Sequence, residues 1–285
     1  MSNNVCKLIG LTLAGVFAAP ALGAPLASTS FEVAEGYPAP PPVYDVRSSS
    51  LVLADGAGWG TNTWAGNNGG STYTYIARDA SAYDGEQYMV LHREEGSDNR
   101  EIRIRRKYDT SLIQDQKVTL SLAFRIDAER TTPDYLDSAF NVYFERGTSD
   151  NLGDENVRLE FTKEGDIKIR SEELASTLTV GQWDDPGQPY YALNTWATLS
   201  FVVDLATQRA SYFVNGEFLG DYEFDDLLSA GEELNQIRFK GPRAYNGSPN
   251  DGVSIDAVSL TTVPEPATLA LLVLGGLLAR RRGRK

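Results

Sequence analysis

The chain has 285 residues, of which 41% are hydrophobic, so about 235 residues remain for one β-sandwich domain once the two ends are set aside. The formal net charge of the chain is −13. Residues 1–24 carry +1 and residues 264–285 carry +4, so the residues between them carry −18. A domain this acidic repels nucleic acid and anionic lipid. Cys6 and His92 are the single cysteine and the single histidine, which excludes disulfides and metal sites built from several such residues.

The first 27 residues have the pattern of a secretory signal peptide. Lys7 gives a short positive region, and the apolar run Leu8 to Ala19 is too short to span a bilayer. Small residues follow, with Ala19-Pro20-Ala21 and Ala21-Leu22-Gly23 as candidate cleavage sites. We therefore expect a signal helix in residues 1–27 and export through the Sec pathway. The alternative is a buried N-terminal helix.

Alternation of apolar and polar residues predicts strands through the middle of the chain. The segments with this pattern, in chain order, are 117–127, 157–161, 167–170, 197–205, 209–224, 235–241 and 252–263. Asn215-Gly216 predicts a tight hairpin inside the fifth of them. No segment predicts a long amphipathic helix, although residues 225–236 favour one short turn.

The order of these strands resembles the concanavalin A-like (laminin G-like) jelly roll. The stretches that carry the resemblance are "SFEVAEGYP" (30–38), "YDGEQYMVLH" (83–92), "TWATLSFVVDLATQRASYFVNGEFLGDYEF" (195–224) and "VSIDAVSL" (253–260). The resemblance implies an all-β fold, an antiparallel β-sandwich at residues 28–262, with the signal helix before it and a hydrophobic helix after it.

Jelly rolls of this kind include glycoside hydrolases, whose retaining members need two carboxyls ~5 Å apart on one strand face. The nearest match is Asp221, Glu223 and Asp225, which alternation places on one face. Their order departs from the hydrolase pattern and they follow a hairpin, so a solvated strand face explains them better. We expect no enzyme; a hydrolase or a polysaccharide lyase with a degenerate motif is the alternative.

Aromatic residues among polar ones favour carbohydrate binding, because sugars stack on flat rings. One such loop contains Trp59 and Trp64, and a second contains Trp183, Tyr190 and Tyr191. These five residues are the candidate ligand contacts. The alternative is that the rings close the ends of the sandwich.

A basic stripe lies at "NREIRIRRKYD" (99–109), where alternation turns Arg103 and Arg105 outward from Ile102 and Ile104. In so acidic a domain the stripe suits an acidic polysaccharide. The alternative is a charged strand face that pairs with carboxylates on its neighbour.

The jelly-roll resemblance also implies a structural calcium, held near the first strand and by an acid in the last strand. The matching residues are Glu32 and Asp256, whose carboxylates are the hard oxygen ligands that calcium takes. Outward-facing surface acids are the alternative. No other cofactor is expected.

The chain ends with Pro264-Glu265-Pro266, an unbroken apolar run at 267–279, and the basic residues Arg280, Arg281 and Arg282. A 13-residue helix reaches roughly 20 Å, against a hydrocarbon core of ~30 Å. Residues 263–285 therefore make a poor lifelong anchor, and we expect only a transient stay in the membrane.

These three features in this order resemble the PEP-CTERM sorting signal of exported proteins from Gram-negative bacteria that make exopolysaccharide. The resemblance implies cleavage near the Pro-Glu-Pro by an exosortase, a membrane protease, and delivery to the cell surface or extracellular matrix. We therefore expect a non-catalytic surface or matrix protein that binds carbohydrate or exopolysaccharide. A protein-protein adhesion module is a further alternative.

Overall fold

The computed structural model describes residues 25–35, 50–52, 63–67, 72–78, 80–93, 102–113, 117–127, 139–147, 154–162, 166–174, 178–181, 191–241 and 252–262. The predicted helix after residue 262 lies outside these ranges. So does the predicted signal helix, apart from residues 25–27, which belong to the first strand. Cleavage after Ala21 or Gly23 would leave that strand whole.

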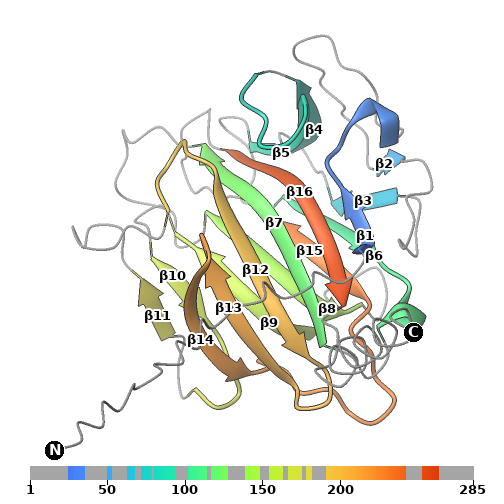
Figure 1. Ribbon diagram of the computed structural model, residues 1–285, viewed down its shortest axis with the longest axis vertical. Helices are drawn as coiled ribbons and strands as arrows, with labels where there is room; N and C mark the ends of the chain where they lie inside the picture. The colour runs from blue at the N-terminus through green and yellow to red at the C-terminus, as the bar shows by residue number, and fades with distance from the viewer. Residues whose placement is uncertain are drawn as a thin grey trace, which may run out of the picture.

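The described residues form two antiparallel sheets of eight strands each. Sheet A contains both of the 11-residue strands, side by side at its centre. Its strand order is β14 (Glu217–Glu223), β13 (Arg209–Val214), β12 (Ala197–Asp204), β7 (Lys117–Asp127), β16 (Gly252–Thr262), β5 (Gln87–Arg93) and β4 (Thr72–Arg78), with β1 (Pro25–Thr29) also paired to β16 (Figure 1).

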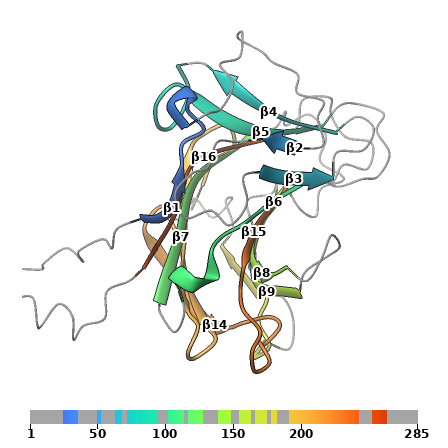
Figure 2. The ribbon, with the colours of Figure 1, turned by 90° about the vertical axis from the view of Figure 1, so that its right-hand side faces the viewer.

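Sheet B lies against sheet A. Its strand order is β11 (Leu178–Gly181), β10 (Ile167–Ile169), β9 (Asp154–Phe161), β8 (Phe140–Arg146), β15 (Gln236–Lys240), β6 (Arg103–Lys107), β3 (Thr63–Asn67) and β2 (Ser50–Val52). Figure 2 shows the two layers, with β7 and β16 in one and β15, β8 and β9 in the other. Two short 3₁₀ turns, η1 (Val33–Glu35) and η2 (Thr110–Leu112), complete the described elements.

Every strand neighbour in both sheets is antiparallel, and strands distant in the chain pair with each other, as β16 does with β7 and β1. This is the antiparallel jelly-roll sandwich that the sequence predicts. The alternation argument is confirmed in β7, where Val118, Leu120, Leu122, Phe124 and Ile126 all lie in the core with at most 2% of their surface exposed.

The hairpin signal is confirmed as well. Asn215 and Gly216 have φ angles of 50° and 79°, the left-handed conformation that a two-residue hairpin turn requires and that Asn and Gly adopt most readily. They join β13 to β14. The short turn expected at 225–236 is present at Ala230–Gly231, where the Glu232 N–H donates to the Ser229 carbonyl at 3.0 Å.

Candidate functional site

The outward side of sheet B carries an unusual set of polar side chains. In β6, β15, β8, β9 and β10 alternate residues such as Ile104, Phe239 and Phe144 lie in the core, so the residues between them point away from it. We call this set the basic face. Its members are Arg103, Arg105, Lys107, Gln236, Arg238, Lys240, Asn141, Tyr143, Glu145, Arg158, Glu160 and Lys168.

Strand register aligns the basic face into rows. The central row contains Arg105, Arg238, Tyr143 and Arg158, which are direct partners across β6, β15, β8 and β9. Neighbouring strands lie ~4.8 Å apart, so this row spans roughly 14 Å. Three arginines therefore flank one tyrosine in a line across the sheet.

The centre of the basic face is withdrawn from solvent. Tyr143 and Glu145 are 0% exposed, Arg238 is 4% exposed and Arg158 is 9% exposed. Charged side chains on the outward side of a sandwich are normally solvated, and a buried charge is costly unless it is paired. The arrangement therefore calls for partners around each charge.

The tyrosine ring lies between two guanidinium groups. The Arg238 Cζ atom is 4.1 Å from the centroid of the Tyr143 ring, and the Arg158 Cζ atom is 5.4 Å from it. Both distances are within the ~6 Å range of cation-π attraction, which is strongest in desolvated places such as this one. The Tyr143 ring, on β8, thus helps to position both arginines, which come from the neighbouring strands β15 and β9.

Each of these arginines also pairs with a glutamate. Arg238 lies 2.9 Å from Glu145 Oε2 and Arg158 lies 2.7 Å from Glu160 Oε2. Gln236 donates a hydrogen bond to the other oxygen of Glu145. A buried ion pair of this kind adds little net stability compared with apolar side chains of the same volume, but loss of one partner is costly because the other charge stays buried.

The two glutamates are not spaced for glycoside hydrolysis. Glu160 pairs with Asn141 on β8, and Glu145 lies four residues further along that strand. At ~3.3 Å per residue the separation along the strand is roughly 13 Å, beyond the ~5–9.5 Å between hydrolase carboxyls.

The periphery of the basic face remains within reach of solvent. Lys107 is exposed, and Arg103, Arg105, Lys240 and Lys168 are half-buried. The prediction that Arg103 and Arg105 point outward from Ile102 and Ile104 is confirmed, since those isoleucines are at most 2% exposed. A ligand on this face would meet these five cations first.

The structure corrects the expectation for Tyr191. Its side chain is 4% exposed, its ring packs edge-on against Phe161, and its hydroxyl donates to the Thr162 carbonyl. A ring inside the core cannot stack on a sugar. Trp59, Trp183 and Tyr190 lie outside the described residues, and of Trp64 the structure places only the backbone in β3.

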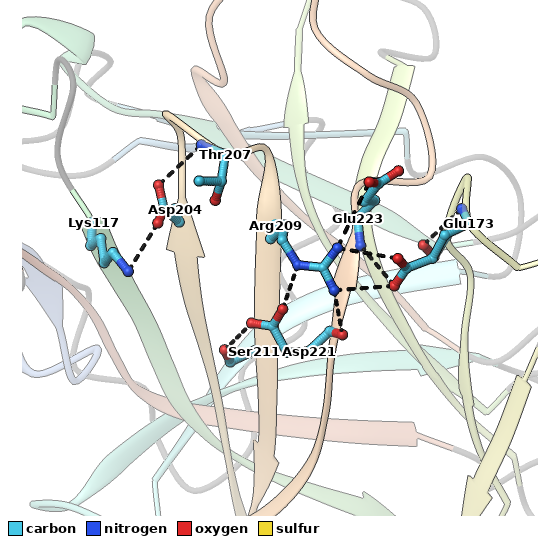
Figure 3. A network of polar contacts seen from close by, with 9 residues as sticks. Lys117, Glu173, Asp204, Thr207, Arg209, Ser211, Asp221 and Glu223 are labelled. Atoms are coloured by element: carbon cyan, nitrogen blue, oxygen red, sulfur yellow. Dashed lines mark hydrogen bonds and ion pairs between the residues drawn. The ribbon is translucent and has the colours of Figure 1, made fainter.

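The acidic strand face that the sequence singled out lies at the edge of sheet A. Figure 3 shows Arg209 between the carboxylates of Asp221, Glu223 and Glu173. The Arg209 Nε is 2.6 Å from Asp221 Oδ1, and NH1 is 3.1 Å from Glu173 Oε2. Asp225 follows the end of β14. Burial disfavours the charge on Asp221, but hydrogen bonds from Ser211 and Arg209 outweigh it and lower its pKa.

These contacts give the acidic face a structural role. Arg209 and Asp221 come from sheet A, whereas Glu173 follows β10 of sheet B. The Glu172 N–H also donates to the Phe224 carbonyl at 3.0 Å. The network therefore ties the two sheets together along one side of the sandwich, and it does not set two carboxyls across a groove.

The two expected calcium ligands meet at one loop. At Asp256 the strand β16 changes partner from β5 to β1, and Ala257 has a φ of 49°. Asp256 Oδ2 accepts from the N–H groups of Tyr83 and Asp84 at 3.1 and 2.9 Å. Glu32 Oε1 accepts from those of Glu86 and Gln87 at 2.7 and 2.9 Å.

The two carboxylates are the hard oxygen ligands that calcium takes, but the printed contacts of each are N–H donors of the 83–87 loop. Burial raises the pKa of Asp256 to about 6, against hydrogen bonds from Asp84, Ala257 and Tyr83 that favour its charged form. A bound cation would reverse that shift. Within the described ranges, no group of three or more His, Cys, Asp or Glu side chains is placed to hold a metal.

The C-terminal end of the chain has a clear relationship. Residues 262–285 match the PEP-CTERM protein-sorting motif, which confirms the prediction from the Pro-Glu-Pro, the apolar run and the arginines. The motif marks an exported protein that is sorted to the cell envelope, and it implies processing by an exosortase. Among the described residues no helix is both apolar enough and long enough to cross a bilayer.

Similar solved structures share the sandwich at low identity. A carbohydrate esterase from Shiga toxin-encoding bacteriophage phi24B is 13% identical with a TM-score of 0.47, over 70% of this chain and 90% of that one. An endo-β-1,4-glucuronan lyase from the fungus Trichoderma reesei is 9% identical with a TM-score of 0.47, over 72% and 91%. A sialidase is 12% identical with a TM-score of 0.43, over 65% of this chain and 16% of that one.

Likeness at this level carries no information about ligand or activity. No curated protein matches the sequence. The basic face is therefore the feature of the domain that bears on its function.

Proposed function

We propose that this is a non-catalytic protein of the cell surface or extracellular matrix whose sandwich domain binds extracellular polysaccharide through the basic face. The observation that carries the proposal is the set of cations within reach of solvent on this face, Arg103, Arg105, Lys107, Lys168 and Lys240, around its buried centre. Sugar sites use a few convergent polar groups of this kind to hold and orient the ligand.

The sorting motif fits this role. Export through the Sec pathway, exosortase cleavage near Pro264-Glu265-Pro266 and release to the surface of a Gram-negative bacterium would place the domain among exopolysaccharides. Contact with the membrane would then be transient. Trp59, Trp64, Trp183 and Tyr190 remain proposed additional contacts.

Affinity electrophoresis through gels that contain single polysaccharides tests the proposal. We expect retardation by at least one polysaccharide, weakened by the double substitution Arg103→Ala and Arg105→Ala on the basic face. The matched control is Lys117→Ala on β7 of sheet A, where the lysine side chain is 57% exposed and 2.9 Å from Asp204. If no polysaccharide retards the chain, or if both variants behave alike, the proposal is wrong.

A polysaccharide lyase is the second candidate and has less support, because the Tyr143 ring beside the two arginines is 0% exposed. Incubation with polyuronates, followed through the ultraviolet absorbance of an unsaturated product, distinguishes the two. The binding proposal predicts no product, and product that disappears with Tyr143→Phe would establish the lyase.

The adhesion alternative has less support. Among the described residues the large hydrophobic side chains that are exposed are Tyr83, Phe218 and Leu227. They come from the loop before β5, from β14 and from the segment after β14, and single exposed residues of this kind are normal on a protein surface.

A further inference from the structure

The charge on the basic face has a sign opposite to that of the domain. Seven of its members are Arg or Lys and two are Glu, whereas the chain between residues 25 and 263 carries −18. A local concentration of one sign attracts ligands of the other sign even when the whole domain repels them. We propose that the polysaccharide bound here is anionic and carries its charge as carboxylates of uronic acid residues.

This inference rests on the proposed function and adds the class of ligand. The two glutamates of the face are already engaged with Arg238 and Arg158 in the buried centre. The cations within reach of solvent are on the strands at either side, with Arg103, Arg105 and Lys107 on β6 and Lys240 on β15. A ligand that lies across β6 and β15 therefore meets positive groups.

The spacing of these cations suits a chain with repeated charges. Arg103 and Arg105 are two residues apart on β6, which is about 7 Å. Lys240 is the direct partner of Arg103 across the strands, with Cβ atoms about 5 Å apart. Three cations thus lie within the length of about two sugar units, and a polymer with a carboxylate on each unit can contact more than one of them at a time.

The choice of arginine points to carboxylates. A guanidinium presents a planar pair of N–H donors that matches the two oxygens of a carboxylate, whereas an ammonium acts as a point charge. Arg103 and Arg105 present this geometry on β6, at the part of the face within reach of solvent.

Nucleic acid fits less well. Duplex DNA carries one charge per ~1.7 Å of its axis. The domain carries a net charge of −18, so its acidic surface outside the basic face repels so dense a polyanion. A polyuronate carries one charge per sugar, at several times that spacing, so the repulsion outside the patch is weaker. The two polymers therefore serve as opposing arms of one experiment.

The experiment uses two forms of one polymer. Polygalacturonate and its fully methyl-esterified form share a backbone and differ in carboxylate charge. Calorimetric titration of the purified full chain should show binding to the acid form, at least about tenfold tighter than to the ester. Binding should weaken several-fold between about 50 and 200 mM salt, because exposed ionic contacts are screened over this range. The same titration is carried out with dextran sulfate and with single-stranded DNA.

Variants identify the face. Arg103→Gln with Arg105→Gln should weaken polygalacturonate binding by about tenfold or more, since two ionic contacts from half-buried arginines are lost. Arg105→Lys should retain the salt dependence and lose part of the affinity. Lys107→Gln and Lys117→Gln form a matched pair of exposed lysines on opposite sheets, and only the former should weaken binding. Thermal melts check that each variant is folded.

The outcomes separate this inference from the proposed function. Equal binding of acid and ester, lost on substitution of Arg103 and Arg105, overturns the anionic ligand and leaves polysaccharide binding in place. Equal or tighter binding of dextran sulfate or DNA overturns the carboxylate. Absence of binding to any polysaccharide overturns both.

Discussion

Substitution of Glu145 by Gln is the sharpest test of the charge arrangement in the basic face. Glu145 is 0% exposed and Arg238 is 4% exposed, with 2.9 Å between Glu145 Oε2 and Arg238 NH2. Glu145→Gln preserves shape and removes the charge, so Arg238 is left buried without its counter-charge. The expected cost is about 3–5 kcal/mol of unfolding free energy, a large part of the ~5–15 kcal/mol that stabilises a typical domain.

Urea denaturation at neutral pH measures this cost. With a slope of ~3 kcal/mol per M, the midpoint should fall by roughly 1–1.7 M. The double variant Glu145→Gln with Arg238→Met should recover much of the loss, because the pair is then replaced and no charge is left alone. As a reference, Asp204→Asn in the exposed pair with Lys117 should cost less than ~1 kcal/mol. A single-variant cost below ~1 kcal/mol, or simple additivity in the double variant, would refute the reasoning.

Three further predictions concern sheet A and its loops. Gly85→Ala should destabilise the chain by ~1–3 kcal/mol, because Gly85 has a φ of 73° and an added Cβ would meet the Glu32 carboxylate. Thermal melts measure this, and an unchanged melting temperature would contradict it. The pKa of Asp221 is lowered from 3.8, so its stabilising contribution is present at neutral pH and is lost as the pH falls below about 4; stability curves of the wild type and Asp221→Asn should converge there, and parallel curves would argue against the Arg209 network. If calcium binds between Glu32 and Asp256, about 1 mM calcium should raise the melting temperature at pH 7, a chelator should reverse the rise, and Asp256→Asn should abolish it; a rise that persists in Asp256→Asn would place the ion elsewhere.

The core of the sandwich follows from the sequence because its physical cause is local. Strict alternation along 117–127 and 197–204 leaves one face apolar, and that face has to be buried against another. The Asn215-Gly216 turn is equally local, since two residues that tolerate positive φ determine the hairpin. The 225–236 segment forms a turn and no helix, and its apolar residues are buried without one: Leu234 lies in the core and Leu228 packs against it.

The site could be predicted only in part, because it depends on which strands become neighbours. Arg103 and Arg105 were recognisable from alternation within one strand. Tyr143, Arg158 and Arg238 occupy the polar positions of their own strands, and that alternation was the available signal. Nothing local shows that β6, β15, β8 and β9 align these residues in one row. The prediction that Tyr191 contacts a ligand was wrong for the same reason, since its burial against Phe161 is a long-range contact.

Hydrogen-deuterium exchange of the full chain with and without polygalacturonate tests the central claim most directly. The account predicts slower exchange on binding in peptides that cover 102–113 and 234–241, the parts of β6 and β15 that carry the accessible cations. Peptides that cover β13 and β14, at 209–223, should not change. Protection at 209–223 with none at 102–113 would contradict the assignment of the binding face.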